Sequence, residues 1–370
     1  MKNIGPKAYI HLDRLRNNIC IIQKQITGRS IMCVVKADAY GHGAEIISKT
    51  IAKEFKNIFF AVFSIDEAIQ LRESGIKNDI LIFSCLQKSW LDISLEHDLV
   101  VTASKMEDLF VLSKIYNDIG QCPRFHLNFD TGMTRLGFNI IDSDKVFEFL
   151  SQNISLPVEG IYSHFATSEE DHSNYSLYQL DRFNKIIEQG RQRNIVFKYI
   201  HCSNSGAVLN IPKAYFNLVR VGMLIYGVPP SNNIEFSVGL EPVMSFCAPI
   251  VNLRRIKVGT KVSYGCDFSA KVDTNIGVIQ MGFADGFPRP WYKEGYIVYK
   301  GKKFKIAGRP CMDQFMVDFC DFMPIIGDYV LVFGNYNGNV LPVEEIAKKI
   351  DTTTYALLTG IHGRTEHTVI

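Results

Sequence analysis

The sequence has little of what marks several large classes of protein. Its 40 basic and 38 acidic residues leave a formal net charge of +2, which gives no electrostatic case for binding nucleic acid or a membrane surface. Nine cysteines are scattered and none forms a C-x-x-C pair, so neither a disulfide framework nor a metal site is indicated. The first residues lack the apolar core of a signal peptide, and no apolar run approaches the length of a membrane span. We therefore expect a cytoplasmic protein whose partners are small neutral or zwitterionic molecules.

The first two thirds of the chain repeat one pattern. Up to about residue 235, short apolar runs alternate with helical patterns. Eight such runs cover residues 31–37, 59–65, 79–86, 99–103, 123–130, 158–165, 199–203 and 217–227. Helix starts between them show the spacing of capping boxes, as at Ser64 with Glu67 and at Ser104 with Glu107. Eight strand–helix repeats favour a closed parallel (β/α)8 TIM barrel over an open doubly wound sheet, and no Gly-x-Gly-x-x-Gly follows a strand.

The last third has another rhythm. Beyond residue 236, strand-like runs arrive close together and are separated by turn residues, with one helical pattern at 343–350. At 370 residues and 47% hydrophobic content, the chain is long enough for two cores. We predict a barrel at 1–235 and a mostly-β domain at 236–370, which the first few residues may join.

The segment at 31–43 carries the first chemical hypothesis. A buried apolar run leads into Lys36, and Gly41 and Gly43 then precede a helical pattern whose free N–H groups would favour an anion such as a phosphate. Burial lowers the pKa of a lysine and exposes the neutral amine that forms a Schiff base with an aldehyde. The alternative is a lysine at a strand end that extends into water.

Other polar residues follow the predicted strands, at the barrel end where active sites lie. They are Asp130 and Arg135 after the fifth run, His164 after the sixth, 203–205 after the seventh, and Arg220, Gly222 and Tyr226 in the eighth. Taken singly, each has an ordinary explanation: a surface arginine, a hydrogen-bonded core histidine, a helix cap or a packed tyrosine.

The run VVKADAYGHG at 34–43 resembles the pyridoxal-phosphate attachment motif of alanine racemases, with Asp38 where the family usually has asparagine. The resemblance implies that Lys36 holds the cofactor covalently and that Tyr40 helps to hold its phosphate. Further segments resemble the same family in order and spacing, which extends the likeness over nearly the whole chain.

These segments carry further implied roles. DTGMTRLGF at 130–138 resembles the segment whose arginine, here Arg135, binds the substrate carboxylate, and SHFA at 163–166 resembles the histidine segment of His164. HCSNSG at 201–206 places Ser205 as a phosphate ligand. In RVGMLIYG at 220–227 the implied phosphate ligands are Gly222, Met223 and Tyr226, while Arg220 faces the pyridine nitrogen and keeps it unprotonated.

In the second domain, KVSYG at 261–265 resembles the segment whose tyrosine, here Tyr264, is the second catalytic base. GRPCMDQ at 308–314 implies that Met312 and Asp313 lie near the substrate, and Tyr355 resembles the tyrosine at the mouth of the site. In this family Tyr264, Met312 and Asp313 come from the partner subunit, so the resemblance implies a homodimer with shared sites.

The implied activity is the interconversion of L-alanine and D-alanine, which supplies D-alanine for cell-wall peptidoglycan. Lys36 would serve the D-enantiomer and Tyr264 the L-enantiomer. Two alternatives stay open: a related barrel decarboxylase or broader amino-acid racemase, and a non-catalytic pyridoxal-phosphate carrier. The segments around Arg135 and Tyr264 weigh against a decarboxylase, and the second domain weighs against a carrier.

Asn128 is the clearest departure from the family pattern. The family often has a lysine there, carried as a carbamate that braces the substrate-binding arginine. A carboxamide cannot be carbamylated, so Arg135 lacks that negative partner. We hypothesise that an anion such as chloride lies between Asn128 and Arg135; the competing hypothesis is a direct hydrogen bond between them.

Overall fold

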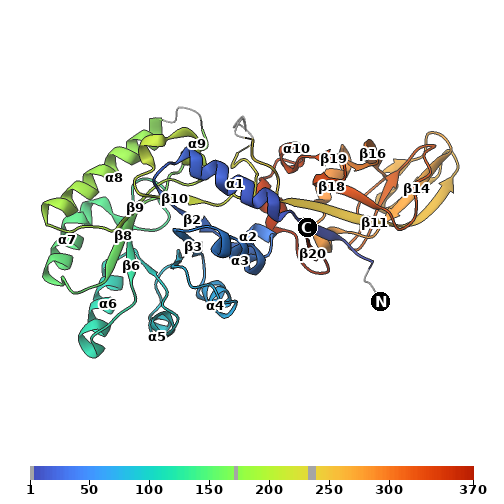
Figure 1. The fold of residues 1–370 in the computed structure, drawn as a ribbon. Helices are drawn as coiled ribbons and strands as arrows, with labels where there is room; N and C mark the ends of the chain where they lie inside the picture. The colour runs from blue at the N-terminus through green and yellow to red at the C-terminus, as the bar shows by residue number, and fades with distance from the viewer. Residues whose placement is uncertain (1–3, 171–173, 232–238) are drawn as a thin grey trace.

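The computed structural model describes residues 4–170, 174–231 and 239–370. It has two parts, a barrel of strands and helices and a β-rich part, which lie side by side in Figure 1. Both parts contribute to one continuous apolar cluster, which includes Ile31 and Phe60 of the barrel and Phe246 and Phe315 of the β-rich part. The predicted division at 235/236 lies outside the described residues.

The barrel is a closed ring of eight parallel strands. They are β2 (Ser30–Val34), β3 (Ile58–Val62), β4 (Ile80–Ile82), β5 (Val101–Ala103), β6 (Phe125–Asp130), β8 (Val158–Tyr162), β9 (Tyr199–His201) and β10 (Leu218–Val221). Two sheets, in the orders β10-β2-β3-β4 and β5-β6-β8-β9, supply most of the ring. A parallel bridge from Leu81 to Val100 closes one seam, and Arg220 N–H donates to Ser203 O across the other at 3.0 Å. The predicted (β/α)8 barrel is confirmed.

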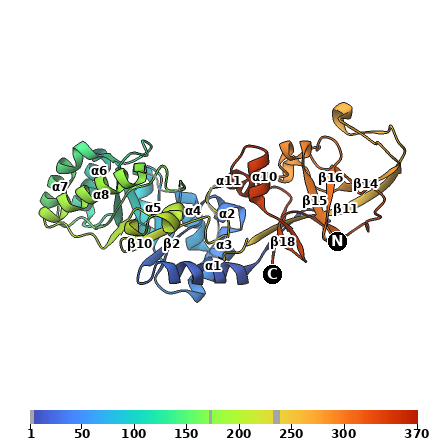
Figure 2. The same cartoon turned by 90° about the horizontal axis from the view of Figure 1, so that it is seen from above.

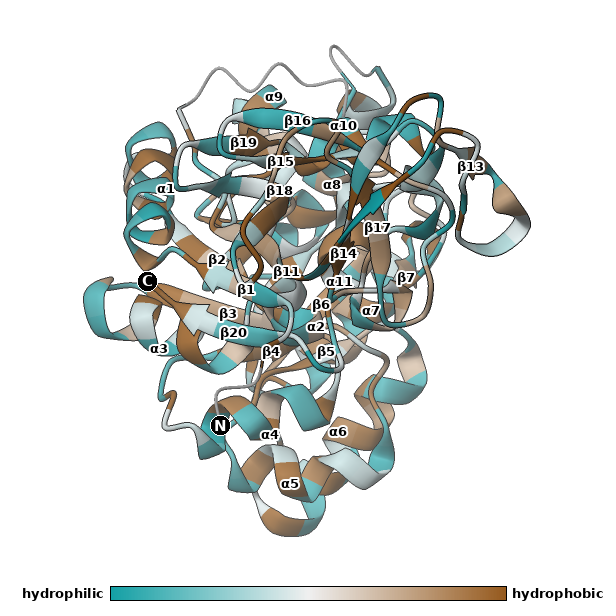
Figure 3. Ribbon diagram, turned by 90° about the vertical axis from the view of Figure 1, so that its right-hand side faces the viewer, coloured by the Kyte–Doolittle hydropathy of each residue, from teal (hydrophilic) through white to brown (hydrophobic). Residues whose placement is uncertain are grey.

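Helices surround the ring, and brown apolar bands alternate with teal polar bands along them in Figure 3. They are α1 (Leu12–Gln25), α3 (Ala44–Glu54), α4 (Ile65–Glu73), α5 (Leu91–Glu96), α6 (Met106–Ile119), α7 (Ser143–Gln152), α8 (Asn174–Gln192) and α9 (Ser205–Asn210). The capping box of Ser64 and Glu67 begins α4 as predicted. The one predicted at Ser104 is wrong, because α6 begins after Lys105 and the Asp108 carboxylate accepts from Ser104 N–H instead.

The C-terminal part is mostly β, as predicted. Its nine-stranded sheet has the order β19-β18-β15-β16-β17-β14-β11-β1-β20, and β11 also pairs with β18. The strands are β1 (Lys7–Ile10), β11 (Met244–Ile256), β14 (Thr274–Ile279), β15 (Tyr296–Tyr299), β16 (Lys302–Ile306), β17 (Phe315–Asp318), β18 (Tyr329–Tyr336), β19 (Asn339–Leu341) and β20 (Glu366–Val369). A separate pair joins β12 (Lys261–Val262) to β13 (Phe268–Ser269). The N-terminal strand β1 therefore belongs to this sheet, between β11 and β20.

Two helices of the C-terminal part, α10 (Val343–Lys349) and α11 (Thr354–Thr359), lie at the junction with the barrel (Figure 2). At Gly41 a Cβ atom would lie 2.2 Å from the Leu358 carbonyl oxygen, so only glycine permits this close approach of α11. His367 also contacts the Gly41 carbonyl oxygen through Nε2 at 2.8 Å. The helix α11 is thereby fixed beside the segment that follows Lys36.

Candidate active site

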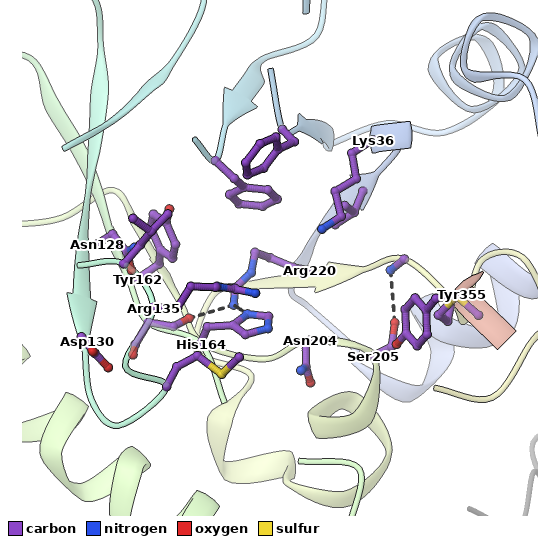
Figure 4. Close-up of a pocket in the computed structure, with 18 of the residues that line it drawn as sticks. Lys36, Asn128, Asp130, Arg135, Tyr162, His164, Asn204, Ser205, Arg220 and Tyr355 are labelled. Atoms are coloured by element: carbon purple, nitrogen blue, oxygen red, sulfur yellow. Dashed lines mark hydrogen bonds between the residues drawn. The ribbon is translucent and has the colours of Figure 1, made fainter. Parts of the chain in front are cut away.

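A cavity of about 530 Å³ opens at the carboxyl ends of the barrel strands (Figure 4). Its polar lining comes from the ends of β6, β8 and β10, from the segments after β2, β6, β8 and β9, and from α11. The predicted site residues that line it are Lys36, Tyr40, Arg135, His164, Ser205, Arg220, Gly222, Met223 and Tyr355. Asn128, Asp130, Tyr162 and Glu169 also line it. Residues up to 319 positions apart are thus brought together, as the barrel topology predicts.

The prediction that Lys36 lies at the end of a strand is wrong. The strand β2 stops at Val34, and Lys36 begins a short helical segment, α2 (Lys36–Gly41). From Ala37 to Tyr40 four consecutive residues have φ between 50° and 54°, which is one turn of left-handed helix. That conformation costs roughly 1–2 kcal/mol for each residue with a Cβ atom. The turn therefore needs support from outside itself.

Two carboxylates hold the left-handed turn. Asp38 Oδ1 accepts from Ala44 N–H at 2.7 Å, which ties the turn to the first residue of α3. Glu67 accepts from Ala37 N–H at 2.6 Å, and its second oxygen accepts from the N–H groups of Phe63 at 2.8 Å and Ser64 at 3.0 Å. The sequence showed Glu67 only as a capping residue, yet its carboxylate joins the lysine turn to the start of α4.

The surroundings of Lys36 favour its neutral amine. Burial is the main cause that lowers its pKa from the ordinary value, and the positive charge of Arg135 acts in the same direction. Glu67 opposes both, since its negative charge favours the ammonium form. A neutral amine is the form that attacks an aldehyde, so this environment is typical of a lysine that forms a Schiff base.

Arg220 is fixed by acceptors on every side but one. Its Nη1 donates to His201 Nδ1 at 2.9 Å and to the His201 carbonyl oxygen at 3.1 Å. Its Nη2 donates to Ser163 O at 2.8 Å, His164 Nδ1 at 3.1 Å and Cys202 O at 3.2 Å. Among the described residues, its Nε–H has no hydrogen-bond partner. The guanidinium thus keeps one donor for a group in the cavity.

An arginine has no acceptor, so the two ring nitrogens that face it must carry lone pairs. His164 and His201 are therefore neutral, with their protons on Nε2. Their pKa values agree with this assignment, because burial and the charge of Arg220 lower both well below 6.5. Any group that accepts from Arg220 Nε–H must likewise be unprotonated at that atom.

Small and hydroxyl-bearing residues form the other end of the cavity, as a phosphate site requires. Gly222 N–H donates to Ser205 Oγ at 3.1 Å, and a Cβ atom at Gly222 would lie 2.9 Å from Tyr40 Oη. Met223 follows in the same wall, and Tyr355 lies beside Tyr40 with ring centres 5.9 Å apart. The glycine therefore leaves room for the tyrosine hydroxyl at this wall.

Tyr226 has a different position from the one implied for a phosphate ligand. It is fully buried, its hydroxyl donates to Val34 O at 3.0 Å, and it does not line the cavity. Its ring packs against Tyr40, with centres 5.4 Å apart. The aromatic body of Tyr226 fits the barrel core, so it supports Tyr40 from behind.

Asn128 and Arg135 face the cavity without a bond to each other. In the part of the chain that the structure describes, no hydrogen bond or ion pair engages the Arg135 guanidinium. The nearby Asp130 is already engaged, since its Oδ1 accepts from the N–H groups of Gly132 at 2.9 Å and Thr134 at 3.0 Å. A carboxylate ligand would therefore find Arg135 available.

Of the four site residues predicted in the C-terminal part, Tyr355 lines this cavity and the other three do not. Tyr264 and Met312 are 69% and 57% exposed, Asp313 is exposed and pairs with Arg364 at 2.8 Å, and none of the three lines the cavity. The segment of Tyr264 does contact the segment of Met312 and Asp313, because Ser263 Oγ donates to the carbonyl oxygen of Arg309. Within one chain, they form a separate exposed group.

Two family models cover most of the chain. The N-terminal domain of alanine racemase matches residues 10–230, and its C-terminal domain matches residues 243–369. The chain belongs to the alanine racemase family. It is therefore a pyridoxal-phosphate-dependent isomerase, and the resemblance seen in the sequence is confirmed.

Individual relatives match over more than nine tenths of their length. The chain is 35% identical to an alanine racemase of Desulforamulus reducens over 362 residues, which cover 96% of each chain. It is 35% identical over 361 residues to alanine racemase 1 of Bacillus subtilis, covering 96% of this chain and 91% of the relative. The solved alanine racemase of Clostridium difficile has a TM-score of 0.93 at 30% identity, covering 100% of this chain and 97% of that one. The likeness thus includes both parts of the fold.

Besides Tyr162, three polar residues of the site region were missed by sequence reasoning. Glu67 supports the lysine turn, Glu169 lines the cavity and accepts from Tyr355 Oη at 3.4 Å, and His126 contacts His201 behind Arg220. His126 occupies an apolar run, and an isolated histidine there gives no signal of its partner 75 residues away.

Among the described residues, no group of three or more His, Cys, Asp or Glu could hold a metal ion, and no helix is long and apolar enough to span a bilayer.

Proposed function

We propose that this chain interconverts L-alanine and D-alanine with pyridoxal phosphate held by Lys36, and that Lys36 and Tyr264 are its two proton-transferring residues. The observation that carries the proposal is one cavity that holds the Lys36 amine, the Arg135 guanidinium and the free Nε–H of Arg220. Supply of D-alanine for cell-wall peptidoglycan is the role proposed for the reaction.

The residues of the cavity fit the cofactor. Lys36 supplies a neutral amine for the aldehyde, and Arg220 Nε–H suits a pyridine nitrogen that accepts and carries no proton. Tyr40, Ser205 and the wall at Gly222 suit the phosphate. When bound, the cofactor withdraws electrons from the α-carbon of the amino acid and so weakens the C–H bond.

Arg220 bears on which reaction follows. Because a guanidinium donates and cannot accept, it disfavours a proton on the pyridine nitrogen, and the ring is a weaker electron sink than one facing a carboxylate. A weaker sink suppresses transamination and decarboxylation relative to simple proton exchange. Arg220 therefore favours a racemase over the decarboxylase alternative.

The chain's own residues would divide the remaining work. Arg135 binds the substrate carboxylate, ideally through two parallel N–H···O bonds. Lys36 exchanges a proton on one face of the α-carbon. His164 carries its proton on Nε2, so it is a donor that would stabilise the phenolate of Tyr264 when that residue works on the other face.

Tyr264 reaches a cavity only if a second chain supplies it. In one chain Tyr264, Met312 and Asp313 are exposed and do not line the cavity, and an exposed tyrosine and methionine are typical of an interface. We therefore propose a homodimer in which each cavity is completed by the partner. A cytoplasmic location stays a prediction, supported by nine cysteines that all remain free thiols.

The test combines trapping with turnover. Borohydride reduction of the cofactor-loaded enzyme should fix a pyridoxyl group on Lys36, and peptide mapping should find it there. In a separate, unreduced sample of the cofactor-loaded enzyme, single alanine enantiomers should racemise without loss of alanine. A label on another lysine, or conversion of alanine to ethylamine and carbon dioxide, would contradict the proposal; the second result would favour the decarboxylase.

A further inference from the structure

On the side of Arg220 that faces away from the cavity, the buried residues His201 and His126 extend a chain of hydrogen bonds that starts at Arg220. His201 on β9 contacts Arg220 through Nδ1, and its Nε2 lies 2.9 Å from Nδ1 of His126 on β6. Both rings are at most 2% exposed. The proposed reaction assigns no role to His126, which does not line the active-site cavity.

The direction of each hydrogen bond in this line follows from Arg220. Because Arg220 only donates, His201 Nδ1 accepts, and a neutral His201 then carries its proton on Nε2. That N–H must donate to His126 Nδ1, which therefore carries a lone pair. The proton positions are thus ordered from Arg220 through His201 to His126.

The fold makes room for this contact at one residue. The strand β8 runs between β6 and β9, and its Gly160 pairs with His126 in the sheet register. A Cβ atom at Gly160 would lie 2.7 Å from three atoms of the His126 ring. The φ angle of Gly160 is not positive, so this glycine serves space and not backbone conformation. The His126 ring can lie across β8 only because residue 160 has no side chain.

His201 is held from a second side by Tyr162. The two rings are stacked with centres 4.9 Å apart and planes 11° apart, and the Arg220 guanidinium carbon lies 5.4 Å from the Tyr162 ring centre. The plane of His201 is therefore set by packing, while its tautomer is set by hydrogen bonds. Among the described residues, only His126 forms a hydrogen bond with Nε2 of His201.

We propose that His126 is a positioning residue: by accepting the Nε2–H of His201, it holds the one tautomer in which His201 accepts from Arg220 and keeps that guanidinium aimed at the cofactor's pyridine nitrogen. The functional half of this inference rests on the proposed function. With His126 absent, His201 can move its proton to Nδ1, where it would oppose the Arg220 N–H and displace the guanidinium.

The environment keeps His126 an acceptor. Burial lowers its pKa to about 3, and Arg124, Arg220 and Lys198 act in the same direction. A protonated His126 would place a second N–H against that of His201. The ring therefore stays neutral across the range in which the enzyme works.

The first test reads the tautomer directly. Solid-state ¹⁵N NMR of the histidine-labelled holoenzyme, with His201 assigned by its loss in His201→Gln, should show a proton on Nε2 and a bare Nδ1. The same spectrum of the cofactor-free protein should agree. A proton on Nδ1 of His201 would overturn the inference, whatever the activity of the enzyme.

The second test uses three substitutions and a matched control. His126→Leu removes the acceptor, Gly160→Ala displaces the ring without changing a polar group, and His126→Asn keeps an acceptor oxygen near the place of Nδ1. Ile161→Val, next to Gly160 in β8, shortens a fully buried side chain that points to the opposite face of that strand from residue 160. The readout is the ratio of abortive transamination to racemisation, where alanine and pyridoxal phosphate become pyruvate and pyridoxamine phosphate.

His126→Leu and Gly160→Ala should raise this ratio by roughly 10- to 100-fold, the effect of one charge-assisted hydrogen bond. The Michaelis constant for alanine should change little, because Arg135 is untouched. His126→Asn should restore most of the wild-type ratio, and Ile161→Val should leave it unchanged. An unchanged ratio in His126→Leu, or an equal rise in Ile161→Val, would overturn the inference. If the wild-type enzyme does not racemise alanine, the proposed function fails, and the NMR result still decides the tautomer.

Discussion

The left-handed turn after Lys36 makes an unusual prediction for glycine. Ala37 is exposed and has φ of 50°, so its Cβ atom gains little from packing and carries the steric cost of the left-handed region. That cost is about 1–2 kcal/mol. Glycine removes it but adds about 0.5–1 kcal/mol of entropy to the unfolded chain. Ala37→Gly should therefore leave the free energy of unfolding unchanged or raise it by up to about 1.5 kcal/mol.

Ala52 is the matched control, because it lies in the regular right-handed helix α3. There the same substitution relieves nothing and should lower the free energy of unfolding by about 1 kcal/mol. The two variants should thus differ by about 1–2.5 kcal/mol, although each loses one methyl group.

Urea unfolding at equal concentrations of protein and cofactor measures the difference as a shift of the first transition midpoint. The hydrogen bond from residue 37 N–H to Glu67 is kept in Ala37→Gly, so it does not confuse the comparison. Equal destabilisation of the two variants would refute the reasoning, since it would mean that Ala37 carries no left-handed strain.

Three further predictions concern the site and its pH dependence. Tyr264→Phe should lower racemisation by about 10²–10⁴-fold in both directions, while α-proton exchange with solvent survives better from D-alanine than from L-alanine because Lys36 still works on that face; equal residual exchange would contradict the assignment of bases. If an anion lies between Asn128 and Arg135, replacing chloride by a large anion at constant ionic strength should raise the Michaelis constant for alanine, and Asn128→Asp should abolish this sensitivity. Kinetics indifferent to the anion would contradict the anion hypothesis. Burial lowers the pKa of His42 to about 4, so on acidification the unfolded chain binds a proton at this histidine before the folded chain does. The contribution of His42 to the free energy of unfolding should be fully present above pH 6.5 and should fall by up to about 3 kcal/mol between pH 6.5 and 4. A His42→Phe variant with the same pH profile would contradict this.

The barrel was predictable because its signal is repeated. Eight apolar runs with helical patterns between them favour one closed topology, and that topology alone predicts that Lys36, His164 and Arg220 meet at one end. The boundaries were less predictable. The apolar run at 217–227 holds a strand of only four residues, Leu218–Val221, because the buried residues that follow form turns.

The left-handed turn could not be predicted, for a physical reason. Positive φ is signalled in sequence by glycine, asparagine and aspartate, and among residues 37–40 only Asp38 is of this kind. Their conformation is imposed by Glu67, 30 positions away from Ala37, and by the close approach of α11 at Gly41. The contact of His126 with His201 could not be predicted either, because it depends on a residue distant in the sequence, Gly160, whose missing side chain leaves room for the His126 ring.

The two departures from the family motifs have different consequences in the fold. Asp38 replaces an asparagine, but its working atom is Oδ1, which accepts from Ala44 N–H at 2.7 Å, and a carboxamide oxygen could make the same bond. The substitution therefore preserves the connection between the lysine turn and α3. Asn128 instead faces the open cavity beside Arg135, where the charge of the side chain matters and where no backbone group of the described residues forms a hydrogen bond with it. A change of one unit of charge is thus absorbed where the geometry needs only an acceptor, and alters the site where the chemistry needs an anion.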